Sequence, residues 1–153
     1  MKDSAKAALV QLTLGPHTPG AIDRMPAFFD QPSAYGSDLN GFPEYVLGNR
    51  IGADDPHGVR FRELAAEHAM YAIAGLVESP GTRWATTALM IDREGTILGR
   101  YRKSHPASGD PPYSWPPVST SPSVAEAKGN LGSQSKVFQL AFEQVGILQC
   151  HNG

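Results

Sequence analysis

Three residues of this chain carry side chains that could act together on an amide or a nitrile. Glu44 follows a Phe-Pro step, Lys103 follows Tyr-Arg, and Cys150 ends an apolar run. A thiol becomes a good nucleophile when a base removes its proton, and a carboxylate in a partly dry pocket can be that base. An ammonium group stabilises the negative charge that nucleophilic attack creates. The three residue types therefore indicate a cysteine-dependent hydrolysis.

Each of these residues also has a purely structural interpretation when it is taken alone. Glu44 could be a solvated loop carboxylate, Lys103 a surface cation, and Cys150 a small buried hydrophobic residue. A metal site built from Cys150, His105 and His151 is not favoured, because their spacing does not match a pair of zinc ligands. We expect no metal and no cofactor, and only the joint pattern supports catalysis.

The N-terminal part must position Glu44. Ala7–Leu14 is a compact apolar run that predicts a buried strand. Four prolines between positions 16 and 32 limit any helix there to a short piece over Ile22–Asp30. An X-Pro step favours an extended backbone at Phe42, which predicts that Glu44 lies at a strand end.

The middle of the chain must position Lys103. Asp55-Pro56 predicts a helix start, and apolar residues then recur at three- and four-residue steps. A strand is predicted over Tyr71–Val77. Ala85–Ile91 and Thr96–Tyr101 predict an antiparallel hairpin closed by Gly95, with Lys103 just beyond it. The alternation indicates an α/β layered domain, although only this one helix is convincing.

The last part of the chain contains a long segment rich in Pro, Ser and Gly, residues 104–135. Such loops are uncommon within a domain and are often binding loops or lids. Its Pro111-Pro112 and Pro116-Pro117 pairs leave open a different function, a proline-rich ligand for an aromatic groove. Lys136–Phe142 and Val145–Gln149 then predict a second hairpin-like pair that leads to Cys150.

Composition excludes several classes of protein. The chain has 153 residues, with 13 Lys and Arg against 15 Asp and Glu, so it carries no basic surface for nucleic acid. Its longest apolar stretch, Ala69–Val77, is far shorter than a membrane-spanning helix. With its single cysteine the chain forms no internal disulfide, which favours a cytoplasmic setting. We expect one domain over residues 1–153, with neither nucleic acid nor membrane as partner.

The segments around Glu44, Lys103 and Cys150 resemble the three signature segments of the nitrilase/amidase superfamily of carbon-nitrogen hydrolases. In that family Glu, Lys and Cys occur in this order, each at the end of a core strand. The resemblance implies a four-layer α-β-β-α sandwich whose second half would follow residue 153, so the chain is expected to be an N-terminal part. It also implies a Glu44–Lys103–Cys150 triad.

Two further residues are implied only by the resemblance. Glu126 stands where many members carry a second glutamate, and the backbone N–H of His151 would join Lys103 in stabilising negative charge. Asn152 departs from the aspartate that is common two positions after the cysteine. The Cys-His-Asn-Gly ending resembles the aliphatic amidase and formamidase branch.

The resemblance implies that a small amide or nitrile and water are the reactants. The favoured reaction is hydrolysis of an amide to ammonia and a carboxylic acid through a Cys150 thioester. N-carbamoyl amino acid hydrolysis, nitrile hydrolysis and a truncated non-catalytic relative remain alternatives. A full-length form is expected to be a homo-oligomer, as family members commonly are.

Overall fold

The computed structural model describes residues 4–12, 21–48, 52–78, 85–104, 132–133 and 136–149. The secondary structure in these ranges consists of two helices and seven strands. In chain order they are β1 (Ala7–Leu9), α1 (Ala21–Ala34), β2 (Leu39–Gly41), α2 (Pro56–Glu67), β3 (Tyr71–Glu78), β4 (Ala85–Ile91), β5 (Ile97–Arg102), β6 (Lys136–Gln139) and β7 (Gln144–Ile147).

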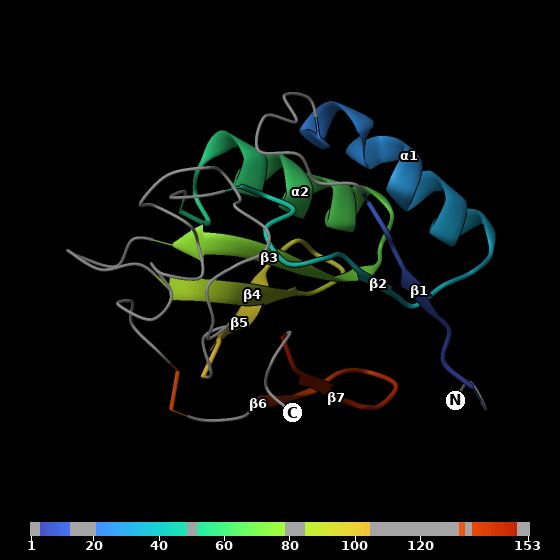
Figure 1. Cartoon of the computed structure of the whole chain (residues 1–153). Coiled ribbons are helices and arrows are strands. Elements are labelled where there is room, and N and C mark those ends of the chain that lie inside the picture. The colour runs from blue at the N-terminus through green and yellow to red at the C-terminus, as the bar shows by residue number, and fades with distance from the viewer. Residues whose placement is uncertain are drawn as a thin grey trace.

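Five strands form one sheet whose spatial order follows the chain, β1-β2-β3-β4-β5. The first three strands are parallel, and β4 and β5 continue antiparallel. Parallel neighbours need crossover connections, and α1 and α2 lie in the two that are required. Both helices cover one face of the sheet, whereas the β6-β7 hairpin lies on the other side (Figure 1). This layering confirms the predicted α/β class.

The sheet separates two apolar cores. On the helix side, the rings of Phe29, Phe42 and Phe61 pack together with centroids 4.9 to 5.3 Å apart. On the hairpin side, Met90 and Tyr101 pack with buried residues of β6 and β7. Burial on both faces gives β4 its uninterrupted run of buried residues.

Helix α2 begins as the sequence predicts. The Asp55 side chain accepts a hydrogen bond from the backbone N–H of His57 at 3.0 Å, with proline at the first helical position. Phe61, Leu64 and Ala65 form its buried face. Within the described ranges, neither helix is long and apolar enough to cross a membrane.

Helix α1 corrects two predictions, because it extends beyond Ile22–Asp30 and makes a second helix over the sheet. Proline lacks an N–H, so Pro32 cannot donate to the carbonyl of Phe28 one turn earlier. The Nδ2 of Asn40 donates to that carbonyl instead, at 2.7 Å. A fully buried amide from the sheet thus replaces the helix bond that proline removes.

The edge of the sheet is shorter and more polar than predicted. Of the described part of the predicted strand Ala7–Leu14, only Ala7–Leu9 pairs with β2, which offers three residues for pairing. This strand was predicted to be buried, but it lies at the sheet edge and is mostly exposed, with Leu9 at 87%. Asp38, just before β2, is buried, and its carboxylate accepts from the backbone N–H of Lys6 at 3.1 Å. Arg93 donates to the same carboxylate at 3.2 Å. Both oxygens of the buried Asp38 carboxylate are therefore paired, one with the backbone of Lys6 and one with Arg93.

Both predicted hairpins are present. β4 and β5 pair antiparallel, and Gly95 in their turn has φ +78°, a conformation that glycine adopts without strain. β6 and β7 also pair, over fewer residues than predicted. The hydroxyl of Tyr71 accepts a hydrogen bond from the backbone N–H of Ala141 at 3.2 Å. The second hairpin is therefore bonded to the first residue of β3.

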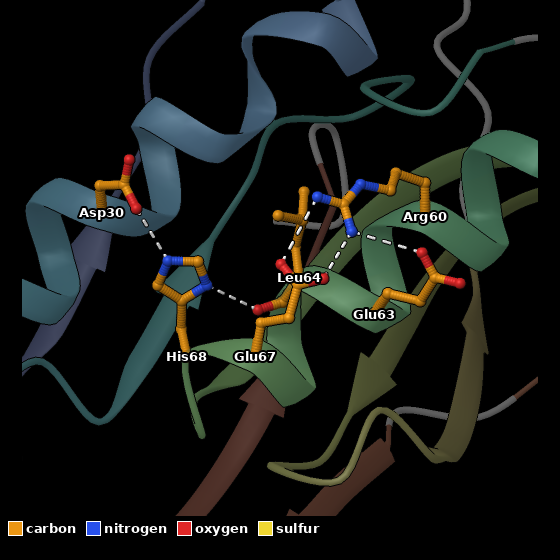
Figure 2. Close-up of polar contacts among 6 residues, drawn as sticks. All are labelled: Asp30, Arg60, Glu63, Leu64, Glu67 and His68. Atoms are coloured by element: carbon orange, nitrogen blue, oxygen red, sulfur yellow. Dashed lines mark hydrogen bonds and ion pairs between the residues drawn. The ribbon is translucent and has the colours of Figure 1, made fainter.

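His68, at the end of α2, connects the two helices (Figure 2). Its Nε2 lies 2.9 Å from Asp30 on α1, and its Nδ1 lies 2.9 Å from the carbonyl of Leu64. Burial, the largest single influence, lowers the pKa of His68. The hydrogen bonds and the charges of Asp30 and Glu67 together outweigh burial and raise this pKa above 6.5. The ring also packs against Phe29, with the ring centroids 5.5 Å apart.

The raised pKa of His68 predicts a pH-dependent stability. The stabilisation is fully present below the unfolded pKa of about 6.5 and is lost as the pH rises through the higher folded value. We expect less than about 1 kcal/mol, because Asp30 is mostly exposed. Urea denaturation between pH 6 and pH 8.5 should show this loss of folding stability in the parent protein. The control variant His57→Gln should show the same loss. If His68→Gln shows the same loss, the assignment to His68 is wrong.

Candidate active site

Glu44 lies in a turn that follows β2 and folds back onto β3. The backbone N–H of Phe42 donates to Ile73 at 3.0 Å, and the N–H of Leu47 donates to Gly75 at 3.0 Å. Tyr45 adopts φ +64°, a left-handed conformation that non-glycine residues rarely take. These bonds at each end hold Glu44 against the sheet in a bent rather than an extended segment.

Lys103 lies immediately after β5. Its backbone N–H continues the pairing with β4 by donating to the carbonyl of Thr86 at 2.9 Å. Its side chain is 3% exposed, although lysine is rarely buried without a partner. Tyr101, two residues earlier, is in the hairpin-side core, so the alternation of the strand places Lys103 on the same face. This burial contradicts the alternative in which Lys103 is a surface cation.

The structure brings Glu44 and Lys103 together across 59 positions of sequence. The Nζ of Lys103 donates to Oε1 of Glu44 at 3.1 Å. The Glu44 side chain is 20% exposed, so the carboxylate keeps access to solvent while the ammonium is nearly enclosed. Two of the three predicted catalytic side chains thus form one ion pair.

A second backbone contact secures Lys103 from the side of the long loop. The N–H of Gly132 donates to the carbonyl of Lys103 at 2.9 Å. A Cβ at position 132 would lie 2.0 Å from the carbonyl oxygen of Arg102, a separation that no side chain tolerates. Gly132 therefore lets the chain that leads to β6 lie directly against the end of β5.

The third predicted catalytic residue, Cys150, lies outside the described residues, and so do Glu126, His151, His105 and Asn152. Gln149, the residue before Cys150, is buried at 7% exposure, and among the described residues its Oε1 has no hydrogen-bond partner. The loop predicted over 104–135 is described only at Ser104, Gly132 and Ser133. The triad roles and the loop's function stay predictions.

The ion pair has the properties that acyl transfer needs. A carboxylate that is partly open to water can exchange protons with a nucleophile, a leaving group and a water molecule in turn. A cation fixed in a nearly dry site stabilises developing negative charge more strongly than one in water. Glu44 and Lys103 can therefore supply the base and the charge stabiliser of one reaction.

A second carboxylate–cation contact lies at the same end of the sheet but on the opposite face. Glu78 accepts from Arg100 at 3.0 Å and from the hydroxyl of Thr87 at 3.1 Å. Thr87 pairs with Leu76, which is in the helix-side core, so Thr87 faces that side of the sheet. Lys103 faces the hairpin side. This cluster connects β3, β4 and β5 and is separate from the Glu44–Lys103 pair.

Sequence reasoning missed the backbone supports of the pair, namely Thr86, Gly132 and Gly75. A glycine inside a strand often marks a site where another segment approaches closely, and Gly75 carried that signal within an otherwise apolar run. Gly132 and Thr86 carried none, because their contacts depend on which segments the fold brings together.

The sequence matches the family model described as carbon-nitrogen hydrolase over residues 6–153. Nitrilase 2 from Arabidopsis thaliana is 26% identical, and the match covers 67% of this chain and 39% of that protein. An aliphatic nitrilase from Rhodococcus rhodochrous is 29% identical over 74% of this chain and 28% of its own length. The chain thus spans well under half the length of these relatives.

Solved structures show the same fold. An amidase from Nesterenkonia sp. superposes with a TM-score of 0.72 at 20% identity, covering 99% of this chain and 57% of that one. A glutamate-to-glutamine variant of the amidase, with the acetamide moiety of fluoroacetamide bound covalently at its active site cysteine, gives 0.75 at 20% identity. That match covers 96% of this chain and 56% of the variant. The predicted nitrilase-superfamily fold is confirmed.

Proposed function

The chain belongs to the carbon-nitrogen hydrolase family, and from this premise we propose that it hydrolyses a linear amide to ammonia and a carboxylic acid. The observation that carries the proposal is the 3.1 Å contact between Nζ of Lys103 and Oε1 of Glu44. It joins the first two of the three segments on which the resemblance depends. The covalent adduct on the active site cysteine of the Nesterenkonia variant supports the same chemistry.

In the proposed first half-reaction, Glu44 removes the thiol proton of Cys150 as the sulfur attacks the carbonyl carbon. Lys103 and the backbone N–H of His151 stabilise the oxyanion that forms. Glu44 then donates its proton to the leaving nitrogen, the carbon-nitrogen bond breaks, and ammonia departs. A thioester remains on Cys150.

In the second half-reaction, Glu44 removes a proton from water as the water oxygen attacks the thioester carbon. The carbon-sulfur bond breaks, the carboxylic acid leaves, and the proton held by Glu44 returns to the Cys150 sulfur. The second glutamate of the resemblance, Glu126, would orient Lys103. Every proton is handled by the chain's own residues, so the proposal needs no cofactor.

A second candidate is nitrile hydrolysis, because the curated relatives cited above are nitrilases. Attack on a nitrile would give a thioimidate, which takes up water and loses ammonia to reach the same thioester. N-carbamoyl amino acids are a further candidate substrate. We also propose a cytoplasmic, homo-oligomeric enzyme, in keeping with the single cysteine and the family resemblance.

Ammonia release from a short aliphatic amide, the matching nitrile and an N-carbamoyl amino acid tests the proposal. We expect release with the amide and a thioester adduct on Cys150 in the mass spectrum. Cys150→Ser should abolish both while leaving the thermal unfolding unchanged. A folded protein that releases no ammonia from any of the three would be the non-catalytic relative and would refute the proposal.

A further inference from the structure

Gly75, in the middle of β3, lies directly beneath the turn that carries Glu44. A Cβ at this position would lie 2.7 Å from the Cα of Glu44, 2.8 Å from the N of Tyr45 and 2.9 Å from the O of Pro43. All three are backbone atoms, and real Cβ atoms essentially never approach so closely. The turn therefore rests on the bare backbone of the strand.

The turn cannot slide away from this contact without losing other bonds. It is bonded to β3 on both sides of the contact, from Phe42 to Ile73 and from Leu47 to Gly75, each at 3.0 Å. A third bond joins Val77 to Gly48 at 3.1 Å. The height of Glu44 above the sheet is therefore fixed by the absence of a side chain at position 75.

The height of Glu44 above the sheet affects its distance to Lys103, because Gly75 and Lys103 lie on the same face of the sheet. Gly75 pairs with Ala88, and Ala88 pairs with Tyr101, two residues before Lys103. The Glu44 side chain must therefore reach from β3 across β4 to the end of β5. A methyl group at position 75 would need to lift the Cα of Glu44 by about 0.7 Å to reach ordinary contact distance.

We infer that Gly75 is a positioning residue for the proposed reaction: its lack of a side chain sets the reach of Glu44 to Lys103. It touches neither substrate nor reacting atoms and acts through the backbone of Glu44. The inference rests on the proposed function for its catalytic consequence only. The geometric part, the control of the ion pair, stands independently.

The chain offers a matched control in Gly99 of β5. Gly99 pairs with Met90, which is in the hairpin-side core, so it faces the same side of the sheet as Gly75. A Cβ there would meet the ring of Phe138, with Cε1 at 2.7 Å, and not the backbone of the Glu44 turn. Gly99→Ala therefore adds the same methyl group and a packing cost without lifting Glu44.

The first test measures the coupling between Glu44 and Lys103 by urea unfolding. Glu44→Gln, Lys103→Met and the double variant form a thermodynamic cycle, repeated in the parent, Gly75→Ala and Gly99→Ala backgrounds. In the parent and in Gly99→Ala, we expect the coupling between Glu44 and Lys103 to change the unfolding constant by about tenfold. In Gly75→Ala, we expect this coupling to be less than about twofold. An undiminished coupling in Gly75→Ala would overturn the inference. Loss of cooperative unfolding in Gly75→Ala alone would also overturn it, because Gly75 would then be a packing glycine.

The second test follows the pH profile of Cys150 alkylation by iodoacetamide, which is unambiguous because the chain has one cysteine. Gly75→Ala should shift this profile toward that of Glu44→Gln, whereas Gly99→Ala should keep the parent profile. A purely structural role would lower stability in both glycine variants and leave both profiles unchanged. If Glu44→Gln itself leaves the profile unchanged, the proposed base role fails, and the coupling test still decides the role of Gly75.

Discussion

Glu44→Gln is expected to lower the rate of amide hydrolysis by about 10³-fold, the effect of removing a positioned general base and acid. The substitution keeps the size of the side chain and an oxygen that can face Lys103 at the observed 3.1 Å contact. In the proposed mechanism, it removes the capacity of Glu44 to take a proton from the thiol and to deliver it to the leaving nitrogen. Ammonia release under saturating amide measures the loss.

The control for this prediction is Glu94→Gln, which makes the same change at an exposed residue of the β4-β5 turn. It should keep the parent rate. Because ammonia leaves before water attacks in the proposed mechanism, Glu44→Gln should also slow the release of the first equivalent of ammonia. A variant that releases the first equivalent at the parent rate and then turns over slowly would restrict Glu44 to the second half-reaction and contradict its double role.

Substitutions at Glu44 and at Lys103 should lower the free energy of unfolding by different amounts. Glu44→Gln removes the carboxylate charge beside an ammonium that is 3% exposed, and we expect a cost of about 3 kcal/mol. Lys103→Met removes the buried charge itself and leaves a carboxylate that is 20% exposed and can be hydrated, at a cost of about 1 kcal/mol. Urea denaturation at neutral pH compares the two.

The double variant checks the explanation. With both charges gone, Glu44→Gln with Lys103→Met should cost less than Glu44→Gln alone, because methionine fills the lysine site without a buried charge. Equal costs for the two single variants would mean that the difference in burial between Glu44 and Lys103 does not control their energetics.

Sequence reasoning succeeded where the determining interactions are local. The Asp55 cap and the Gly95 turn act within a few residues, and α2 and the β4-β5 hairpin are present as predicted. It failed at α1, because proline forbids the local helix bond and the replacing donor, Asn40, comes from another element. Local sequence propensities cannot predict a hydrogen bond whose donor is brought into place only by the tertiary fold.

In the candidate site, too, some features could be predicted from the sequence and others depend on tertiary contacts. Glu44 and Lys103 could be named from their segments and the family resemblance, and the structure brings them into contact. The deep burial of Lys103 could not be predicted, since a lysine after two arginines reads as a surface residue. The close approach at Gly75 is also a tertiary fact, because it needs the turn from residues 43–48 to fold back over β3.

The spatial order of the central sheet has a consequence for how the protein is made on the ribosome. Because β1 to β5 lie side by side in the order of synthesis, each new strand can add to an edge that already exists. N-terminal segments generally fold first during translation. Glu44 and Lys103 can thus meet once β5 has left the exit tunnel, before Cys150 emerges from it. The nascent chain would then form the charged part of the site before the proposed nucleophile is exposed.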